Sequence, residues 1–158
     1  MPMTVSSKAM DEFDGRCNCL AARQAARYLT AVYDKALQPV NLRATQFSIL
    51  HKLANHGPLT IGELAAEMAM DRTTLATNLK PLERDGLVSM APGVDRRAKN
   101  ASVTRAGMAR YRQAFPLWSA VQSEFETAYG ERKAASLREA MRAVLTTGFE
   151  PWAEAAVA

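Results

Sequence analysis

Long apolar runs, cysteines and aromatic side chains are all scarce in this sequence. No apolar run approaches the ~20 residues of a membrane-spanning helix, and residues 1–14 are polar and acidic, without the apolar segment of a secretory signal. We therefore expect a cytoplasmic protein with no membrane partner. The only two cysteines, Cys17 and Cys19, are too close together to make a disulfide framework. An aromatic content of 7% favours packed helices over a β-sandwich.

Positive charge is concentrated in one part of the chain. Residues 71–110 hold eight of the 20 basic residues but four of the 16 acidic ones, so they carry the whole formal net charge of +4. A local basic region on an otherwise balanced chain is typical of proteins that bind a polyanion. The alternative interpretation is an ordinary solvated face, and composition alone does not separate the two.

The spacing of apolar residues predicts two helices in the first third of the chain. Apolar residues recur at helical intervals from Cys17 to Leu37, and Pro39 and Asn41 end that segment. A second helix is expected from about Thr45 to His56. It ends at Gly57-Pro58, because proline cannot continue a helix and glycine readily closes one.

Two short helices are expected next, in the spacing of a helix-turn-helix. Thr60 and Glu63 form the pattern of a capping box at the start of the first. After a tight break, Asp71 is expected to cap the second helix, in which three leucines recur at i, i+4 and i+7. This second helix stops at Asp85-Gly86.

A change of period then predicts a β-hairpin. Leu87–Ala91 and Ala101–Val103 read as short strands, and the polar, basic stretch of residues 92–100 reads as the loop between them. The expected fold is mainly α with a small β-hairpin wing, a winged helix-turn-helix over residues 45–104. The first helix (residues 15–44) and the C-terminal helices (residues 105–150) are expected to form a dimerisation domain.

The argument for a dimer comes from the amphipathic C-terminal helices. Thr104 is expected to cap a long helix, which Pro116 should kink or locally unwind. A last helix from about Glu131 to Phe149 is expected to bury apolar residues in turn. Nothing else in the chain is large enough to cover these faces together with that of the first helix, so we expect a homodimer. The alternative is that the two ends pack only on each other. On a monomer, Trp118, Phe125, Tyr28 and Leu29 would leave a large apolar surface exposed. The apolar residues of the two C-terminal helices are Tyr111, Phe115, Trp118, Val121 and Phe125, and then Leu137, Met141, Val144 and Leu145.

The second helix of a helix-turn-helix enters the major groove of DNA, with its N-terminal half facing the base edges. Arg can bridge two guanine acceptors, Asn can pair with adenine, and Thr can contact phosphate or a thymine methyl group. In the hairpin loop, Asp95 is expected to hold an arginine side chain in position, and Arg96 and Arg97 to reach phosphates or a minor groove. The predicted DNA-binding residues are Arg72, Thr73, Thr74, Thr77, Asn78, Lys80, Asp95, Arg96, Arg97 and Lys99.

In four segments the sequence resembles the MarR family of bacterial regulators. These are residues 59–65 (LTIGELA), 82–88 (LERDGLV), 95–97 (DRR) and 103–107 (VTRAG). The resemblance implies an obligate homodimer that binds a pseudo-palindromic operator on double-stranded DNA, usually as a repressor. It also implies release by a small-molecule effector bound between the dimer helices and the DNA-binding lobe, or by cysteine oxidation. Tyr28, His51, Tyr111 and Trp118 are candidates for the effector pocket, although core packing explains them equally well.

The cysteine pair offers an alternative mode of release. In the hydroperoxide-sensing branch of the family that the sequence resembles, a reactive cysteine sits near the start of the first helix, where Cys19 falls. The tyrosines that this branch uses in the second helix are missing from residues 45–47, and a tolerated thiol pair is the plainer interpretation. A metalloid site on Cys17 and Cys19 would need a third ligand, and His51 and His56 give it little support.

Two other classes of function are weighed against DNA binding. The sequence has no Gly-rich phosphate loop, no metal-ligand cluster and no pairing of a nucleophile with a base, so neither an enzyme nor a cofactor is expected. A winged helix used only for protein contact is the other alternative. Charge reversal at Arg96 and Arg97 would separate it from a DNA-binding protein.

Overall fold

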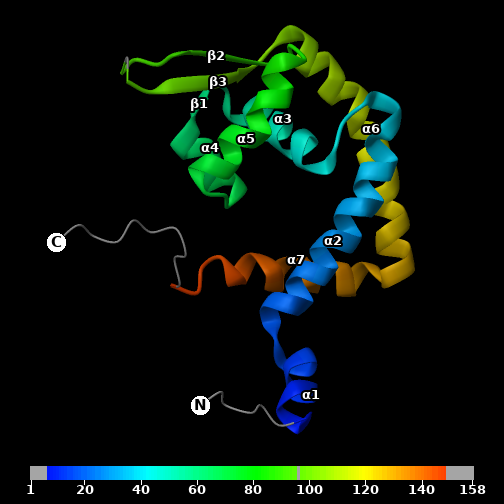
Figure 1. Ribbon diagram of the computed structural model, residues 1–158. Coiled ribbons are helices and arrows are strands. Elements are labelled where there is room, and N and C mark those ends of the chain that lie inside the picture. The colour runs from blue at the N-terminus through cyan, green and yellow to red at the C-terminus, as the bar shows by residue number, and fades with distance from the viewer. Residues whose placement is uncertain (1–6, 96, 149–158) are drawn as a thin grey trace, which may run out of the picture.

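The computed structural model describes residues 7–95 and 97–148, apart from the side chains of residues 9–11. Its helices and strands form a lobe, built from the middle of the chain, and an arm of long helices, built from both ends (Figure 1). None of the helices within the described residues is both long enough and apolar enough to cross a bilayer.

The arm begins with two helices where the sequence predicted one. Helix α2 (Asn18–Leu37) matches the predicted first helix, and the 3-10 turn η1 (Gln38–Val40) ends it with Asn41 in the left-handed region, at φ 53°. Helix α1 (Ser7–Arg16) precedes it, in a stretch that the sequence analysis treated only as polar and acidic. This helix was missed because few of its residues are apolar, namely Ala9, Met10 and Phe13.

The lobe contains three helices that follow local capping signals. Helix α3 (Ala44–His56) ends at Gly57, and α4 (Ile61–Met68) begins with the predicted capping box between Thr60 and Glu63. Ala69, at φ 50°, makes the tight break, and α5 (Arg72–Arg84) follows, continuous through Pro81. The helix-turn-helix predicted from the sequence is therefore present as α4 and α5.

A three-stranded antiparallel sheet in the order β1-β3-β2 completes the lobe. Strands β2 (Val88–Pro92) and β3 (Lys99–Val103) form the hairpin, which projects away from the helices (Figure 1). The hairpin is longer than predicted, because Pro92 and Lys99 pair with each other. The short strand β1 (Leu59–Thr60) pairs with β3 on the side opposite β2. The sequence analysis interpreted this segment only as the start of a helix.

The two C-terminal helices return along the arm. Helix α6 (Arg105–Tyr129) starts at Thr104 as predicted, and it packs beside α2 (Figure 1). It stays one α-helix across Pro116, so the local unwinding considered as one outcome of this proline is absent. Helix α7 (Glu131–Val144) follows Gly130, and it ends before the predicted limit at Phe149, which lies outside the described residues.

The hydrophobic core lies inside the lobe and at its junction with the arm. The leucines of α5 pack there against Leu50, Leu53 and Leu64, all fully buried. The apolar residues of the arm are different, since Met141, Val144 and Leu145 are 43%, 64% and 67% exposed. Within a single chain the buried residue of α7 is Ala134, so the burial expected for these three side chains depends on the expected dimer.

Candidate nucleic-acid interface and effector cavity

Asp71 builds the start of helix α5. Its Oδ1 accepts a hydrogen bond from the backbone N–H of Thr74 at 2.8 Å, and its Oδ2 accepts one from the Thr74 hydroxyl at 2.6 Å. These bonds hold the pKa of Asp71 below its usual value, the hydroxyl bond being the larger cause. The carboxylate is therefore committed to the helix cap, and it fixes the first turn that carries Arg72 and Thr73.

One face of α5 is exposed and polar, opposite its three buried leucines. Thr73, Thr77 and Lys80 lie on this face at helical spacing, and all three are exposed. The Thr77 hydroxyl donates to the Thr73 carbonyl at 3.1 Å, and Asn78 Nδ2 donates to the Thr74 carbonyl at 2.9 Å. The residues of α5 that were predicted to contact DNA thus share one surface, but several of them already donate hydrogen bonds within the helix.

Arg72 lies against helix α4 at a position without a side chain. A Cβ built on Gly62 would lie 3.4 Å from Nη2 and 3.5 Å from Nε of Arg72. The guanidinium therefore packs directly over the first turn of α4, while the residue as a whole stays exposed. The two helices of the helix-turn-helix contact each other through this pair on their solvent side.

The hairpin tip is organised by backbone hydrogen bonds. The N–H of Gly93 donates to the Ala98 carbonyl at 2.8 Å, and the N–H of Ala98 donates to the Asp95 carbonyl at 2.9 Å. Asp95 Oδ1 accepts a hydrogen bond from the backbone N–H of Arg97 at 3.1 Å. The carboxylate thus shapes the turn, and the expected ion pair between Asp95 and an arginine side chain is not found among the described residues. Arg96 lies outside them.

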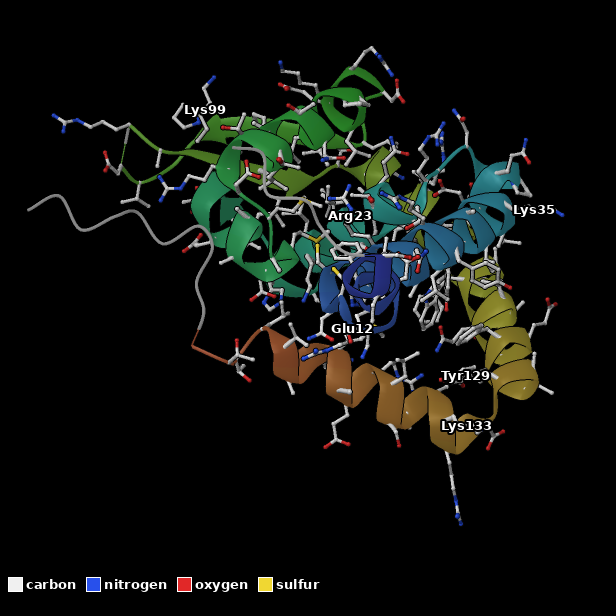
Figure 2. The ribbon with its side chains drawn as sticks, turned by 60° about the horizontal axis from the view of Figure 1, so that its bottom comes forward. Glu12, Arg23, Lys35, Lys99, Tyr129 and Lys133 are labelled. Carbon is white, nitrogen blue, oxygen red and sulfur yellow. The ribbon has the colours of Figure 1, made fainter. Side chains whose placement is uncertain are left out.

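Exposed side chains surround that tip. Arg97 and Lys99 are both exposed, and Figure 2 shows Lys99 on the hairpin. Val94 is also fully exposed at the tip. Two other cations of the basic region have structural roles: Arg84 pairs with Asp85 at 3.2 Å, and Arg110 donates to the Val40 carbonyl at 3.0 Å.

A cavity of about 420 Å³ lies where α2, α3 and α6 meet. Aromatic rings form much of its wall: Phe47 stacks against Trp118 with 6.2 Å between ring centroids, and Phe115 lies 5.3 Å from Trp118. Lys52 lies at the wall, and its Nζ forms an ion pair with Oε2 of Glu67 at 2.9 Å. The lining residues are Leu29, Thr30, Tyr33, Leu37, Ala44, Phe47, Ser48, His51, Lys52, Phe115 and Trp118.

The four residues named from the sequence for an effector pocket are placed differently. His51 and Trp118 line the cavity. Tyr111 lies behind the wall, where it stacks on Phe47 at 5.4 Å and contacts His51. Tyr28 is 65% exposed and does not line this cavity. Tyr33, five residues further along α2, lines it instead.

His51 is bonded on both sides of its ring. Asn55 Nδ2 lies 2.9 Å from Nε2, and the Tyr111 hydroxyl lies 2.8 Å from Nδ1. The amide N–H can only donate, so Nε2 is the acceptor and Nδ1–H donates to Tyr111. Burial lowers the pKa of His51 below 6.5, and the charges of Lys52 and His56 lower it further. A neutral imidazole therefore joins α3 to α6.

A second polar network leads from the cavity to helix α7. The Tyr33 hydroxyl donates to Gln122, which donates in turn to Glu126 at 2.9 Å, and Arg138 of α7 also donates to Glu126. Burial raises the pKa of Tyr33, with Glu126 as a smaller cause in the same direction. The sequence offers no signal for this network, because Tyr33 and Gln122 are 89 residues apart.

The cysteines flank the start of α2. Cys17 is the N-cap residue, and its Sγ accepts a hydrogen bond from the N–H of Leu20 at 3.3 Å. Cys19 is exposed, and neither thiol is in a disulfide. The third ligand that a metalloid site would need is not found: no group of three or more His, Cys, Asp or Glu side chains in the described part of the chain could hold an ion.

Comparison with known proteins adds independent findings. The model of the MarR family matches residues 42–99. The transcriptional regulator MosR of M. tuberculosis, solved in complex with DNA, is 40% identical over 82% of this chain and 98% of its own, with a TM-score of 0.70. The uncharacterized HTH-type transcriptional regulator YwoH of Bacillus subtilis is 29% identical over 57% of this chain, and the match spans 66% of YwoH, just under two thirds.

More distant structures share the fold. A variant of MarR from E. coli in complex with operator DNA has a TM-score of 0.74 at 21% identity, covering 84% of this chain and 96% of its own. Similarity at this level of identity concerns the arrangement of helices and strands. It agrees with the winged helix-turn-helix lobe and the helical arm described above.

Proposed function

The chain belongs to the MarR family of transcriptional regulators, and from this premise we propose that it represses transcription as a homodimer on a pseudo-palindromic operator until a small molecule releases it. The family and the relatives are transcriptional regulators, so this chain is a regulator and not an enzyme. The observation that carries the proposal is the placement of the exposed face of α5 and the basic hairpin on one lobe (Figure 1). The DNA complex of MosR supports it.

In the proposed complex, α5 lies in the major groove and the hairpin reaches the neighbouring backbone or minor groove. Thr73, Thr77 and Lys80 then face the base edges, since they lie opposite the buried leucines. Arg97 and Lys99 contact phosphates, which position the protein without reading sequence. A protein that works on chromosomal DNA in this way works in the bacterial cytoplasm.

The proposed dimer forms through residues 15–44 and 105–150. Val144 and Leu145 of α7 and Tyr28 of α2 are all more than 60% exposed in the single chain. Burying apolar surface of this kind stabilises association by about 25 cal/mol per Å² before the costs of association. A two-fold dimer presents two copies of α5, which is why the operator should be a pseudo-palindrome.

Selection from random duplex DNA tests the proposal. We expect one enriched palindromic sequence, with an affinity that falls steeply as salt increases. Charge reversal of Arg96 and Arg97 to Glu should abolish binding, while reversal of Arg132 and Lys133 on α7 should leave it in place. A hairpin variant that binds DNA as tightly as the natural chain would indicate a winged helix used for protein contact.

The proposed effector site is the cavity between α2, α3 and α6. Its volume of about 420 Å³ lies in the range of small-molecule sites. Stacked aromatic rings suit a flat aromatic ligand. Lys52 would bind a carboxylate of that ligand by exchanging its ion pair with Glu67, so we propose a flat aromatic anion. Since α3 belongs to the lobe and α2 and α6 to the arm, a ligand that separates them changes the spacing of the two copies of α5.

A matched pair of probes tests this site. We expect 2-naphthoate to quench tryptophan fluorescence and to weaken operator binding, and 2-naphthamide, which lacks the charge, to do both less well. The chain has a second tryptophan at position 152, so Trp118→Phe is the control. Loss of the quenching in this variant assigns the quenching to the cavity. If naphthoate quenches Trp118 but leaves operator affinity unchanged, the cavity binds ligands without releasing DNA.

A thiol switch is the second candidate, favoured by the position of Cys17 as the cap of α2. Peroxide would oxidise one thiol to a sulfenic acid with loss of water, and the other thiol would displace a second water to form the disulfide. A Cys17–Cys19 bond would remove Sγ from its hydrogen bond with Leu20 and disturb the start of α2. Peroxide should then release DNA from the natural chain but not from Cys17→Ser or Cys19→Ser. Equal release from the variants would contradict the switch.

A further inference from the structure

Three polar side chains of α5 each donate a hydrogen bond within the helix. The hydroxyl of Thr74 donates to Asp71, whose ionised carboxylate can only accept. The Thr77 hydroxyl donates to the Thr73 carbonyl, and the Asn78 amide donates to the Thr74 carbonyl. A carbonyl cannot donate, so the direction of each of these bonds is settled by chemistry.

These bonds determine which groups remain for a partner. With Oγ1 of Thr77 held against the backbone, its staggered rotamer leaves the Cγ2 methyl as the outward group. Asn78 keeps Oδ1 as an acceptor and one of the two hydrogens of Nδ2 as a donor, because the Thr74 carbonyl holds only the other hydrogen. The middle of the exposed face therefore presents a methyl group and one edge of an amide, while Arg72 and Lys80 near its ends remain strong donors.

We propose that α5 reads the middle of each operator half-site through this methyl and this amide edge. The Thr77 methyl contacts the C5-methyl group of a thymine, and Asn78 pairs with an adenine through Oδ1 and its remaining N–H. The hydroxyls of Thr74 and Thr77, whose single hydrogens are held within the helix, donate to no base. This inference rests on the proposed placement of α5 in the major groove.

The hydrogen bond to Thr74 holds the amide of Asn78 in place. Asparagine often reads adenine with both its amide oxygen and its amide nitrogen. Here one hydrogen of Nδ2 stays on the Thr74 carbonyl while the other is left for the base, and Asn78 is half-buried against the helix. We therefore expect a preference for adenine at that position.

Threonine variants and a modified base test the methyl contact. Thr77→Val keeps the methyl and should bind the selected operator as the natural chain does. Thr77→Ser loses it and should bind roughly fourfold more weakly per half-site, on the order of tenfold for the dimer. Deoxyuridine in place of the contacted thymidine should weaken binding of the natural chain by the same factor. It should not weaken binding of Thr77→Ser any further.

Selection with Asn78→Ala tests the amide contact. The natural chain should select adenine at one position of each half-site, and the variant should lose that preference. A natural preference for another base at the position where Asn78→Ala loses selectivity overturns the assignment of Asn78. The methyl assignment is overturned if Thr77→Val binds as weakly as Thr77→Ser, or if no deoxyuridine substitution weakens binding.

Two further variants separate failure of this inference from failure of the proposed function. If α5 is in the groove, Arg72→Ala and Lys80→Ala weaken operator binding whatever Thr77 contacts. If the Thr77 hydroxyl contacts a base instead of the methyl group, Thr77→Val should bind the operator more weakly, as these two variants do. If none of the four α5 positions affects operator affinity or sequence preference, α5 is not the reading helix, and the proposed function falls with the inference.

Discussion

The imidazole of His51 donates a hydrogen bond from Nδ1 to the hydroxyl of Tyr111 at 2.8 Å, and so connects the DNA-binding lobe to the helical arm. The two residues are 60 positions apart in the chain, on α3 and α6. His51 also lines the cavity, and Asn55 holds its other nitrogen as an acceptor. This contact therefore couples the cavity wall to the relative position of the lobe and the arm.

The His51 network should make stability depend on pH. In the folded chain the pKa of His51 is lowered, chiefly by burial, whereas in the unfolded chain it returns to about 6.5. As pH falls below about 6.5 the unfolded state takes up the proton first, so the free energy of unfolding decreases until the lowered pKa is passed, and then levels off. His51→Gln should remove this part of the decrease, as measured by urea unfolding at a series of pH values.

Titration by NMR gives a direct check of the cause. The His51 ring signal should titrate below pH 6.5, and Lys52→Met should move its midpoint upward by removing a neighbouring positive charge. A His51 midpoint above 6.5 in the natural chain would contradict both the burial and the charge argument.

Gly107 should not tolerate even a methyl group. A Cβ at this position of α6 would lie 2.0 Å from the Leu87 carbonyl oxygen and 2.9 Å from the Val103 side chain. Gly107→Ala should therefore displace α6 from the hairpin and cost more than about 2 kcal/mol of stability. Gly62→Ala is the matched control, since its new methyl meets Arg72 at 3.4 Å and gains helix propensity; its stability should change by less than about 1 kcal/mol. Equal losses in urea unfolding would refute the packing argument.

Arg97 should contribute to the salt dependence of operator binding. If each subunit places this guanidinium on a phosphate, Arg97→Ala should reduce the slope of log K against log salt by about one per subunit. Lys133→Ala serves as the control, because Figure 2 shows this side chain extending from α7 into solvent, away from the hairpin. Fluorescence anisotropy at several salt concentrations measures both slopes, and the same slope for Arg97→Ala and the natural chain would exclude the contact.

Leu145 should be needed for dimerisation. Its side chain is 67% exposed next to Val144, so a charge there is tolerated by the single chain but would be buried in the proposed dimer. We expect Leu145→Glu to sediment as a monomer and to lose operator binding. Val94→Glu also places a charge at an exposed apolar position, on the hairpin, and it should remain a dimer. A dimeric Leu145→Glu variant would show that this end of the arm lies outside the interface.

Local signals were the reliable part of the sequence analysis. The caps at Thr60, Asp71 and Thr104 were predicted because each involves residues three apart, which the chain brings together whatever else it does. The hairpin was predicted from its change of period, and its pairing extended further than the alternation suggested. For Asp95, the described residues show a partner that the sequence analysis did not name, the backbone N–H of Arg97 two residues further along the chain.

The cavity shows the limit of such signals. Tyr28 and Tyr33 are both aromatic residues of α2, and the sequence does not distinguish them. The helix turns by about 100° per residue, so five positions separate a residue that is largely exposed from one that faces α6. The direction in which α2 packs on α6 decides between them, and that direction depends on contacts spread over the whole chain.

By itself, the sequence determined the order of helices and strands, the helix-turn-helix, the basic hairpin and the buried face of α5, because hydrophobic period, capping and local charge act over a few residues. Only the tertiary structure decided which side chains surround the cavity, that Arg72 lies over Gly62, and that Tyr33 reaches α7 through Gln122 and Glu126. These contacts join residues on separate helices, and they exist only once the packing of those helices has brought the residues together.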